Sequence, residues 1–62
     1  MNLQRLEQEL VQIDLGIAWN KVFLYKANRW GEREQEEKYR KEIDKYKDMR
    51  SLVEQIIQTI KD

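Results

Sequence analysis

The sequence contains no cysteine, no histidine and no proline, and only two of its 62 residues are glycine. Without cysteine there is no disulfide, and without cysteine or histidine there is no soft-ligand metal site. The same absences remove the commonest general base and the strongest common nucleophile of enzymes. The lack of proline and scarcity of glycine favour long, uninterrupted helices. We therefore expect a helical protein that is not an enzyme and holds no metal or cofactor.

A surplus of charge of either sign is also missing, because twelve basic residues balance twelve acidic ones. The chain as a whole therefore has no bias toward nucleic acid or an anionic membrane. Its most apolar window, Val11 to Tyr25, is interrupted by Asp14 and Lys21 and is too short to span a bilayer. The first residues do not resemble a secretory leader. We expect a soluble, cytoplasmic protein.

Apolar residues in the first half recur at alternating steps of three and four, the pattern of a helix that buries one stripe in a coiled coil or small bundle. The stripe consists of Leu3, Leu6, Leu10, Ile13, Ile17, Asn20, Leu24 and Ala27. Asn2 is a suitable N-cap for this helix. The pattern predicts a helix over about residues 3–28.

The best break in the chain is the turn at about 29–31. Gly31 can adopt the left-handed conformation that ends helices, and Glu32 and Glu34 suit the start of the next helix. A second helix is expected over about 32–61, so that 1–62 forms a single helical-hairpin domain. One unbroken helix through Gly31 is the alternative.

A strand period competes with the helix over part of the first half. From Val11 to Ile17 apolar and polar residues alternate, and Val22 to Tyr25 could supply a second strand. The intervening Asn20-Lys21 lacks the glycine that tight hairpin turns favour, and the helical stripe passes through the same residues. We prefer the helix, and a β-hairpin over Val11–Tyr25 stays open.

The second half is rich in opposite charges four residues apart, which support a helix weakly. Its predicted buried side consists of Tyr39, Ile43, Tyr46, Met49, Val53, Ile56 and Ile60, with Leu52 and Ile57 alongside. A short turn favours an antiparallel arrangement of the two helices. At the open end we expect Leu3, Leu6, Leu10 and Ile13 to face Met49, Val53, Ile56 and Ile60. Near the turn we expect Trp19, Phe23, Leu24 and Trp30 to lie close to Tyr39, Ile43 and Tyr46.

The first helix carries more apolar surface than one partner helix can cover, and such a patch marks an association site. We expect an all-α fold, an antiparallel two-helix hairpin that dimerises into a four-helix bundle. Asn20 could fix the register of the dimer by pairing with its own copy, or be solvated. The candidate interface consists of Val11, Leu15, Trp19, Asn20, Val22, Phe23, Tyr25 and Trp30. The predicted function is a self-associating regulatory or protein-interaction module, and a different protein as partner stays open.

Nucleic-acid binding is the alternative function. Its candidate phosphate contacts are Lys21, Lys26, Arg29, Lys38, Lys41 and Lys45. Interleaved Glu42, Asp44 and Asp48 weaken this hypothesis. In length and hairpin design the chain resembles the Rop family of dimeric four-helix bundles that bind RNA, but the resemblance covers architecture alone and matches no motif.

Overall fold

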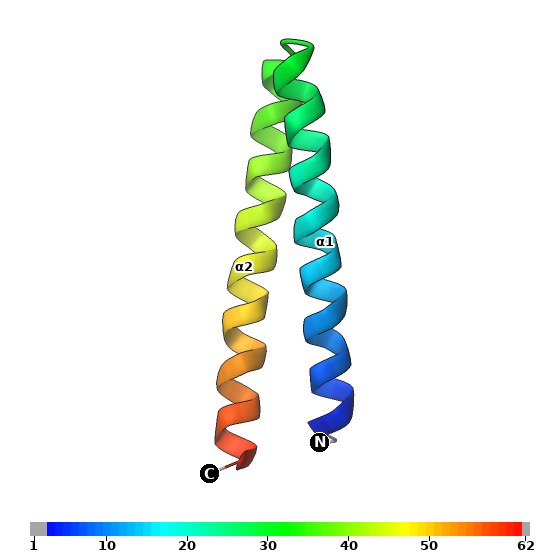
Figure 1. Cartoon of the computed structure of the whole chain (residues 1–62). Helices are drawn as coiled ribbons and strands as arrows, with labels where there is room; N and C mark the ends of the chain where they lie inside the picture. The colour runs from blue at the N-terminus through cyan, green and yellow to red at the C-terminus, as the bar shows by residue number, and fades with distance from the viewer. Residues whose placement is uncertain (1–2, 62) are drawn as a thin grey trace.

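The computed structural model describes residues 3–61, which form two long helices joined by a tight turn. Helix α1 spans Leu3–Arg29 and helix α2 spans Arg33–Lys61. The helices run antiparallel, so the two chain ends lie at the same end of a rod of 47 × 14 × 12 Å (Figure 1). The predicted hairpin is therefore confirmed. The proposed N-cap, Asn2, lies outside the described residues.

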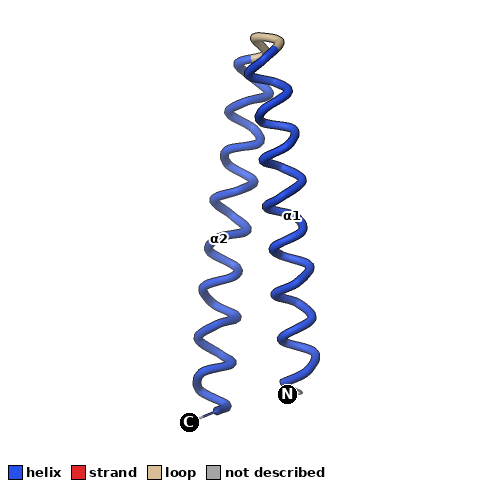
Figure 2. Tube along the Cα trace, in the orientation of Figure 1, coloured by secondary structure: helices blue, strands red, loops and turns tan. Residues whose placement is uncertain are grey.

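The residues open to a strand interpretation are helical, as the tube drawing shows (Figure 2). Val11–Tyr25 lies wholly inside α1, and no strand occurs between residues 3 and 61. The β-hairpin alternative is therefore wrong. A helix satisfies every backbone group inside this segment while keeping its three-four stripe on one side, whereas an isolated two-stranded hairpin is marginal in water.

The turn is a Schellman motif with Gly31 at its left-handed position, where φ is 70°. The Glu32 N–H donates to the Ala27 carbonyl over 2.9 Å, and the Gly31 N–H donates to the Asn28 carbonyl over 3.2 Å. The Glu36 N–H donates to the Glu32 carbonyl, which opens the hydrogen-bond ladder of α2. The bonds to Ala27 and Asn28 use carbonyls that the end of α1 would otherwise leave unpaired. The chain therefore reverses at Gly31, and the alternative of one unbroken helix is wrong.

The seam between the helices follows the predicted stripe of α1. Ile13, Ile17 and Ala27 are buried, and the other members of that stripe are partly buried. Ile13 and Ile17 form a cluster with Ile43 of α2. Leu24, Tyr46 and Val53 pack against this cluster. The core is thus a narrow line of aliphatic side chains.

On α2 the predicted buried side is wrong toward the open end. Ile57 is 8% exposed, whereas Ile56 is 37% exposed, and Met49 and Ile60 are also exposed. The predicted stripe took two successive steps of three, Ile43 to Tyr46 to Met49, which rotates it around the helix. In the structure the three-four alternation continues from Tyr46 through residue 50 to Val53 and Ile57, so Arg50 occupies the place given to Met49.

Candidate functional site

Three aromatic rings in contact with one another link the two helices near the turn. The rings of Trp19 and Phe23 stack at 6.1 Å between centroids, and those of Phe23 and Tyr39 lie tilted at 5.5 Å. Both spacings fall in the range of favourable aromatic pairs. This places Phe23 beside Tyr39 as expected, yet Trp19 is still 59% exposed. The rings thus leave apolar surface open to solvent.

A second apolar stripe, which we call the outer stripe, runs along α1. It consists of Val11, Leu15, Ala18, Val22 and Tyr25, all of them exposed. At 3.6 residues per turn these positions lie about 150° around α1 from the buried seam, so α2 leaves them uncovered. Trp30 is also exposed at the turn. In a single chain the candidate interface therefore remains accessible, and its contact with another chain stays a prediction.

Asn20 differs from the other candidate interface residues, because it lies on the seam between α1 and α2. It is partly buried, and its Nδ2 donates to the Gly16 carbonyl over 2.8 Å. The side-chain amide thereby satisfies a hydrogen bond within its own helix. A role in pairing with a second copy is not needed to explain the residue.

Helix α2 also carries exposed apolar residues that the sequence interpretation placed on or beside its buried side. They are Met49, Leu52, Ile56 and Ile60, all in the half of α2 farthest from the turn. The signal that could have found them is the heptad phase set by Tyr39, Ile43 and Tyr46. Continued without a slip, that phase turns Met49 and Ile56 away from the seam.

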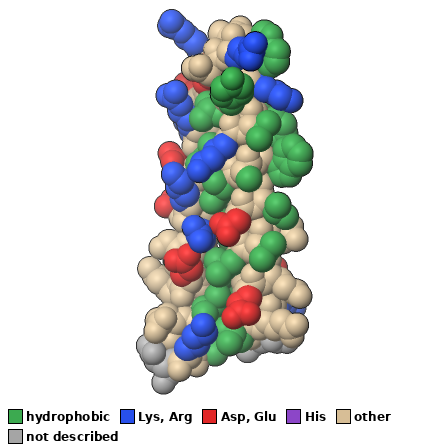
Figure 3. All heavy atoms as spheres, in the orientation of Figure 1, with side chains coloured by type: hydrophobic (Ala, Val, Ile, Leu, Met, Phe, Trp, Pro, Cys, Tyr) green, Lys and Arg blue, Asp and Glu red, His purple; other side chains and the backbone are tan. Residues whose placement is uncertain are grey.

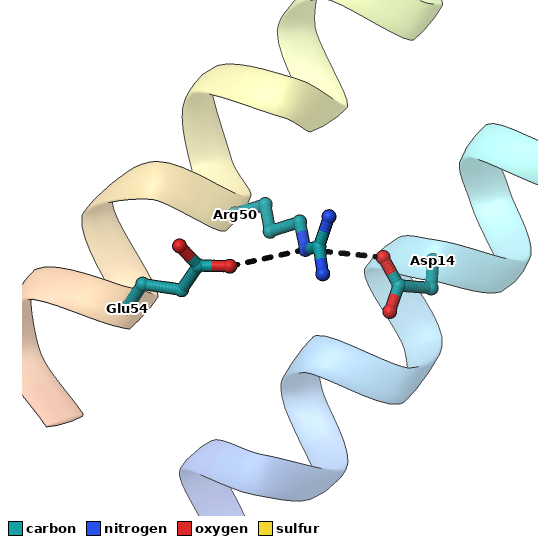
Figure 4. A network of polar contacts seen from close by, with 3 residues as sticks. All are labelled: Asp14, Arg50 and Glu54. Carbon is teal, nitrogen blue, oxygen red and sulfur yellow. Dashed lines mark ion pairs between the residues drawn. The ribbon is translucent and has the colours of Figure 1, made fainter.

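A charged cluster bridges the helices on one face (Figure 4). The Arg50 Nε lies 3.2 Å from Asp14 Oδ1 of α1 and 3.2 Å from Glu54 Oε1 of its own helix. All three side chains are about half exposed, at 48%, 51% and 53% for Arg50, Asp14 and Glu54. Solvent screening makes such pairs worth little, from nothing to about 1 kcal/mol. The cluster orients Asp14 toward α2 more than it stabilises the fold.

A shallow groove between the helices is lined with cations. Its lining consists of Lys21, Leu24, Arg40, Ile43, Asp44 and Lys47. Figure 3 shows Lys and Arg side chains gathered over the half of the molecule nearer the turn, with hydrophobic side chains along the α1 edge. The groove thus presents three positive charges and one negative charge over an aliphatic floor.

The proposed phosphate contacts are not brought together on this groove. Lys21 lines it, whereas Lys38, Lys41 and Lys45 follow their own three-four spacing, about 120° around α2 from the seam. Lys41 pairs with Glu37 over 3.5 Å. Arg40 and Lys47, which the sequence interpretation did not select, are the groove's other cations. Their seven-residue spacing places both on one face of α2, but it does not indicate that this face meets Lys21 of α1.

Within residues 3–61, no helix is long and apolar enough to cross a membrane. Nor does that part of the chain gather three acidic side chains in a geometry that could hold a metal ion. Comparisons of the chain with protein-family models, with curated proteins and with solved structures each gave no match.

Proposed function

We propose that this chain is a non-enzymatic interaction module that self-associates through the exposed, aromatic-rich face of α1. The observation that carries the proposal is the exposure of Val11, Leu15, Trp19, Val22 and Tyr25 on a helix whose opposite side already holds the core. A helix apolar over most of its circumference requires more than one neighbour. The chain itself supplies one.

A second copy is the partner we favour because the hairpin has little core of its own. Among the described residues, five are buried hydrophobics, Ile13, Ile17, Ala27, Ile43 and Ile57, and none has a side chain less than 2% exposed. Folds below roughly 70–80 residues commonly need a disulfide, a metal or oligomerisation to be stable. This sequence has no cysteine. Dimerisation brings four helices together and supplies the missing burial.

A regulatory role and a cytoplasmic location belong to the same proposal. A small dimer without catalytic groups acts by occupying a binding surface, and a fold that uses no disulfide does not need an oxidising compartment. We place the protein among regulators that work by association, with a different protein partner as the outcome to be found if self-association fails.

Light scattering on a size-exclusion column tests self-association directly. At micromolar concentration we expect twice the 7.7 kDa mass of the chain. The informative variant is Leu15→Lys, since Leu15 is 48% exposed on the outer stripe. Burial of the exposed half of a leucine contributes about 1 kcal/mol per copy, so the dimer should weaken by about thirtyfold. Circular dichroism should show an unchanged helix content.

Leu52→Lys is the matched control, because Leu52 is 60% exposed but lies on α2. This variant should dimerise like the unsubstituted protein. A monomeric mass for the unsubstituted chain across the accessible concentration range would remove the self-association proposal. Equal weakening by both variants would show that the α1 face is not the contact.

Nucleic-acid binding is the second candidate, and the observation in its favour is the groove with Lys21, Arg40 and Lys47. A gel shift with duplex RNA at low and raised salt tests it, since phosphate contacts weaken steeply with salt. Binding should fall in the double variant Arg40→Gln, Lys47→Gln. It should persist in Lys38→Gln, Lys45→Gln, whose side chains lie outside the groove. No shift at low salt would eliminate the candidate.

A further inference from the structure

The outer stripe has the form of a second coiled-coil seam with near-symmetry about its centre. Its members follow steps of four, three, four and three, with Ala18 in the middle. Val11 and Tyr25 lie seven residues to each side of Ala18, while Leu15 and Val22 lie three and four residues away. A stripe that reads similarly in both directions suits contact with its own copy around a two-fold axis.

We propose that the outer stripes of two chains pack against each other antiparallel, with the two-fold axis beside Ala18. The inference rests on the proposed self-association and specifies its geometry. In this arrangement Val11 of each copy lies opposite Tyr25 of the other, and Leu15 interleaves with Val22. Ala18 permits a close approach where the helices cross. The two α1 helices then form the middle of a four-helix layer, with α2 of each copy on the outside.

The charges beside the stripe select the antiparallel direction. Asp14 and Lys21 lie on the same flank of the outer stripe, seven residues apart. The antiparallel two-fold places Asp14 of each copy beside Lys21 of the other, which gives two opposite-charge contacts. Lys26 lies on the opposite flank of the stripe. A parallel pairing would bring opposite flanks together and place Lys21 of one copy beside Lys26 of the other, which juxtaposes like charges. Charge complementarity therefore favours a second copy in the antiparallel direction.

The contacts already seen within one chain are compatible with this pairing. Asp14 is half exposed and uses Oδ1 toward Arg50, and a carboxylate can accept from more than one donor. Lys21 lies at the cationic groove with Arg40 and Lys47, where an approaching carboxylate meets net positive charge. The dimer contact thus adds to the intramolecular ion pair and does not replace it.

Trp19 lies on the opposite flank of the outer stripe from Asp14 and Lys21, and it offers a large aromatic surface that dimerisation would bury. It follows Ala18 in the chain, so the two-fold axis brings the Trp19 residues of both copies close together at the middle of the contact, on that flank. Each ring already stacks on Phe23 within its own chain. Large aromatic side chains bury roughly 150–250 Å² each and dominate the energetics of interfaces. Antiparallel pairing covers the most exposed part of this aromatic surface.

Disulfide trapping tests the geometry cleanly, since the chain has no cysteine of its own. Single cysteines are placed at exposed positions as Val11→Cys, Ala18→Cys and Tyr25→Cys. We expect the Ala18→Cys variant to link to itself under mild oxidation. Val11→Cys and Tyr25→Cys should each link poorly alone and efficiently when mixed, because only opposite positions come within the 4.4–6.8 Å Cα separation of a disulfide.

Ser51→Cys, on the exposed surface of α2, is the control for random collision and should not link. Self-linking of Val11→Cys alone would show a parallel pairing and overturn this inference. A dimer by light scattering with no trapping at these positions would also overturn it, while leaving self-association intact. A monomer at every concentration would instead remove the proposed function itself.

A charge swap gives an independent measurement. Lys21→Glu should raise the dimer dissociation constant roughly fivefold, because Asp14 then faces Glu at two contacts. The triple variant Asp14→Lys, Lys21→Glu, Arg50→Met restores opposite charges across the axis without setting a lysine against Arg50, and it should recover most of the affinity. Lys26→Glu should have little effect. Equal weakening by Lys21→Glu and by the triple variant, measured against Arg50→Met alone, would contradict the antiparallel contact.

Discussion

At the scale of single residues, Gly16 and Tyr46 show why α1 carries a glycine in its middle. A Cβ added at Gly16 would lie 2.8 Å from Tyr46 Cζ and about as close to both Cε atoms. The tyrosine ring of α2 therefore rests directly on the backbone of α1. Intrinsic preference alone suggests that glycine weakens this helix by about 1 kcal/mol. The neighbouring helix makes the small residue necessary.

We expect Gly16→Ala to lower the free energy of unfolding by about 1 kcal/mol. Overpacking costs typically 1–3 kcal/mol, which outweighs the gain in helix propensity. Urea denaturation followed by circular dichroism measures the change. The same substitution should be neutral or stabilising in a Tyr46→Leu background, where the clashing ring atoms are gone. If alanine costs as much in that background, the close approach is not the reason for the glycine.

The charge of Arg50 contributes less to the stability of the fold than its position between the two helices suggests. Arg50→Met removes both ion pairs but keeps an apolar stem beside the seam. Because Arg50 and its two partners, Asp14 and Glu54, are each about half exposed, we expect the free energy of unfolding to change by less than about 1 kcal/mol. Salt dependence of unfolding should also decrease. A loss above about 2 kcal/mol in urea denaturation would contradict this account.

At the scale of the elements, the turn depends on one backbone conformation. Gly31 has φ of 70°, and a Cβ built there meets nothing within 4 Å. Gly31→Ala should therefore cost about 1 kcal/mol through backbone strain alone. Chemical synthesis with D-alanine at this position should stabilise the hairpin, since that residue prefers positive φ. Thermal unfolding compares the two, and equal melting temperatures would contradict the proposed role.

The two helices and the seam of α1 follow from patterns that local chemistry determines. Leu10, Ile13, Ile17 and Leu24 keep one phase, so the stripe they predict is the stripe that packs. On α2 the apolar residues Met49, Leu52, Val53, Ile56 and Ile57 fit more than one phase. Apolar residues alone could not decide between them, because the phase set by Tyr39, Ile43 and Tyr46 continues through the charged Arg50. The contacts that fix this phase, Tyr46 on Gly16 and Arg50 with Asp14, join distant parts of the chain.

The candidate site likewise has one part that the sequence could predict and one part that it could not. The exposure of Trp19, Tyr25 and Trp30 was predictable from an excess of apolar positions over covering positions. The cationic groove was not, because Lys21 meets Arg40 and Lys47 only once the register of the hairpin is known. Sequence spacing finds the faces of one helix, whereas a site shared by two helices requires their alignment.

At the scale of the whole molecule, a thin rod with a narrow core implies that stability and association are linked. Whatever binds only the folded chain raises its apparent stability, and for a dimer that binding partner is the chain itself. We therefore expect the melting temperature to rise with protein concentration. The Leu15→Lys variant should melt at a lower temperature at every concentration, because its dimer is about thirtyfold weaker. Leu52→Lys should retain the concentration dependence. Scanning calorimetry over a hundredfold range of concentration makes the measurement, and identical melting temperatures for the unsubstituted chain throughout that range would show that the hairpin's stability owes nothing to a second copy.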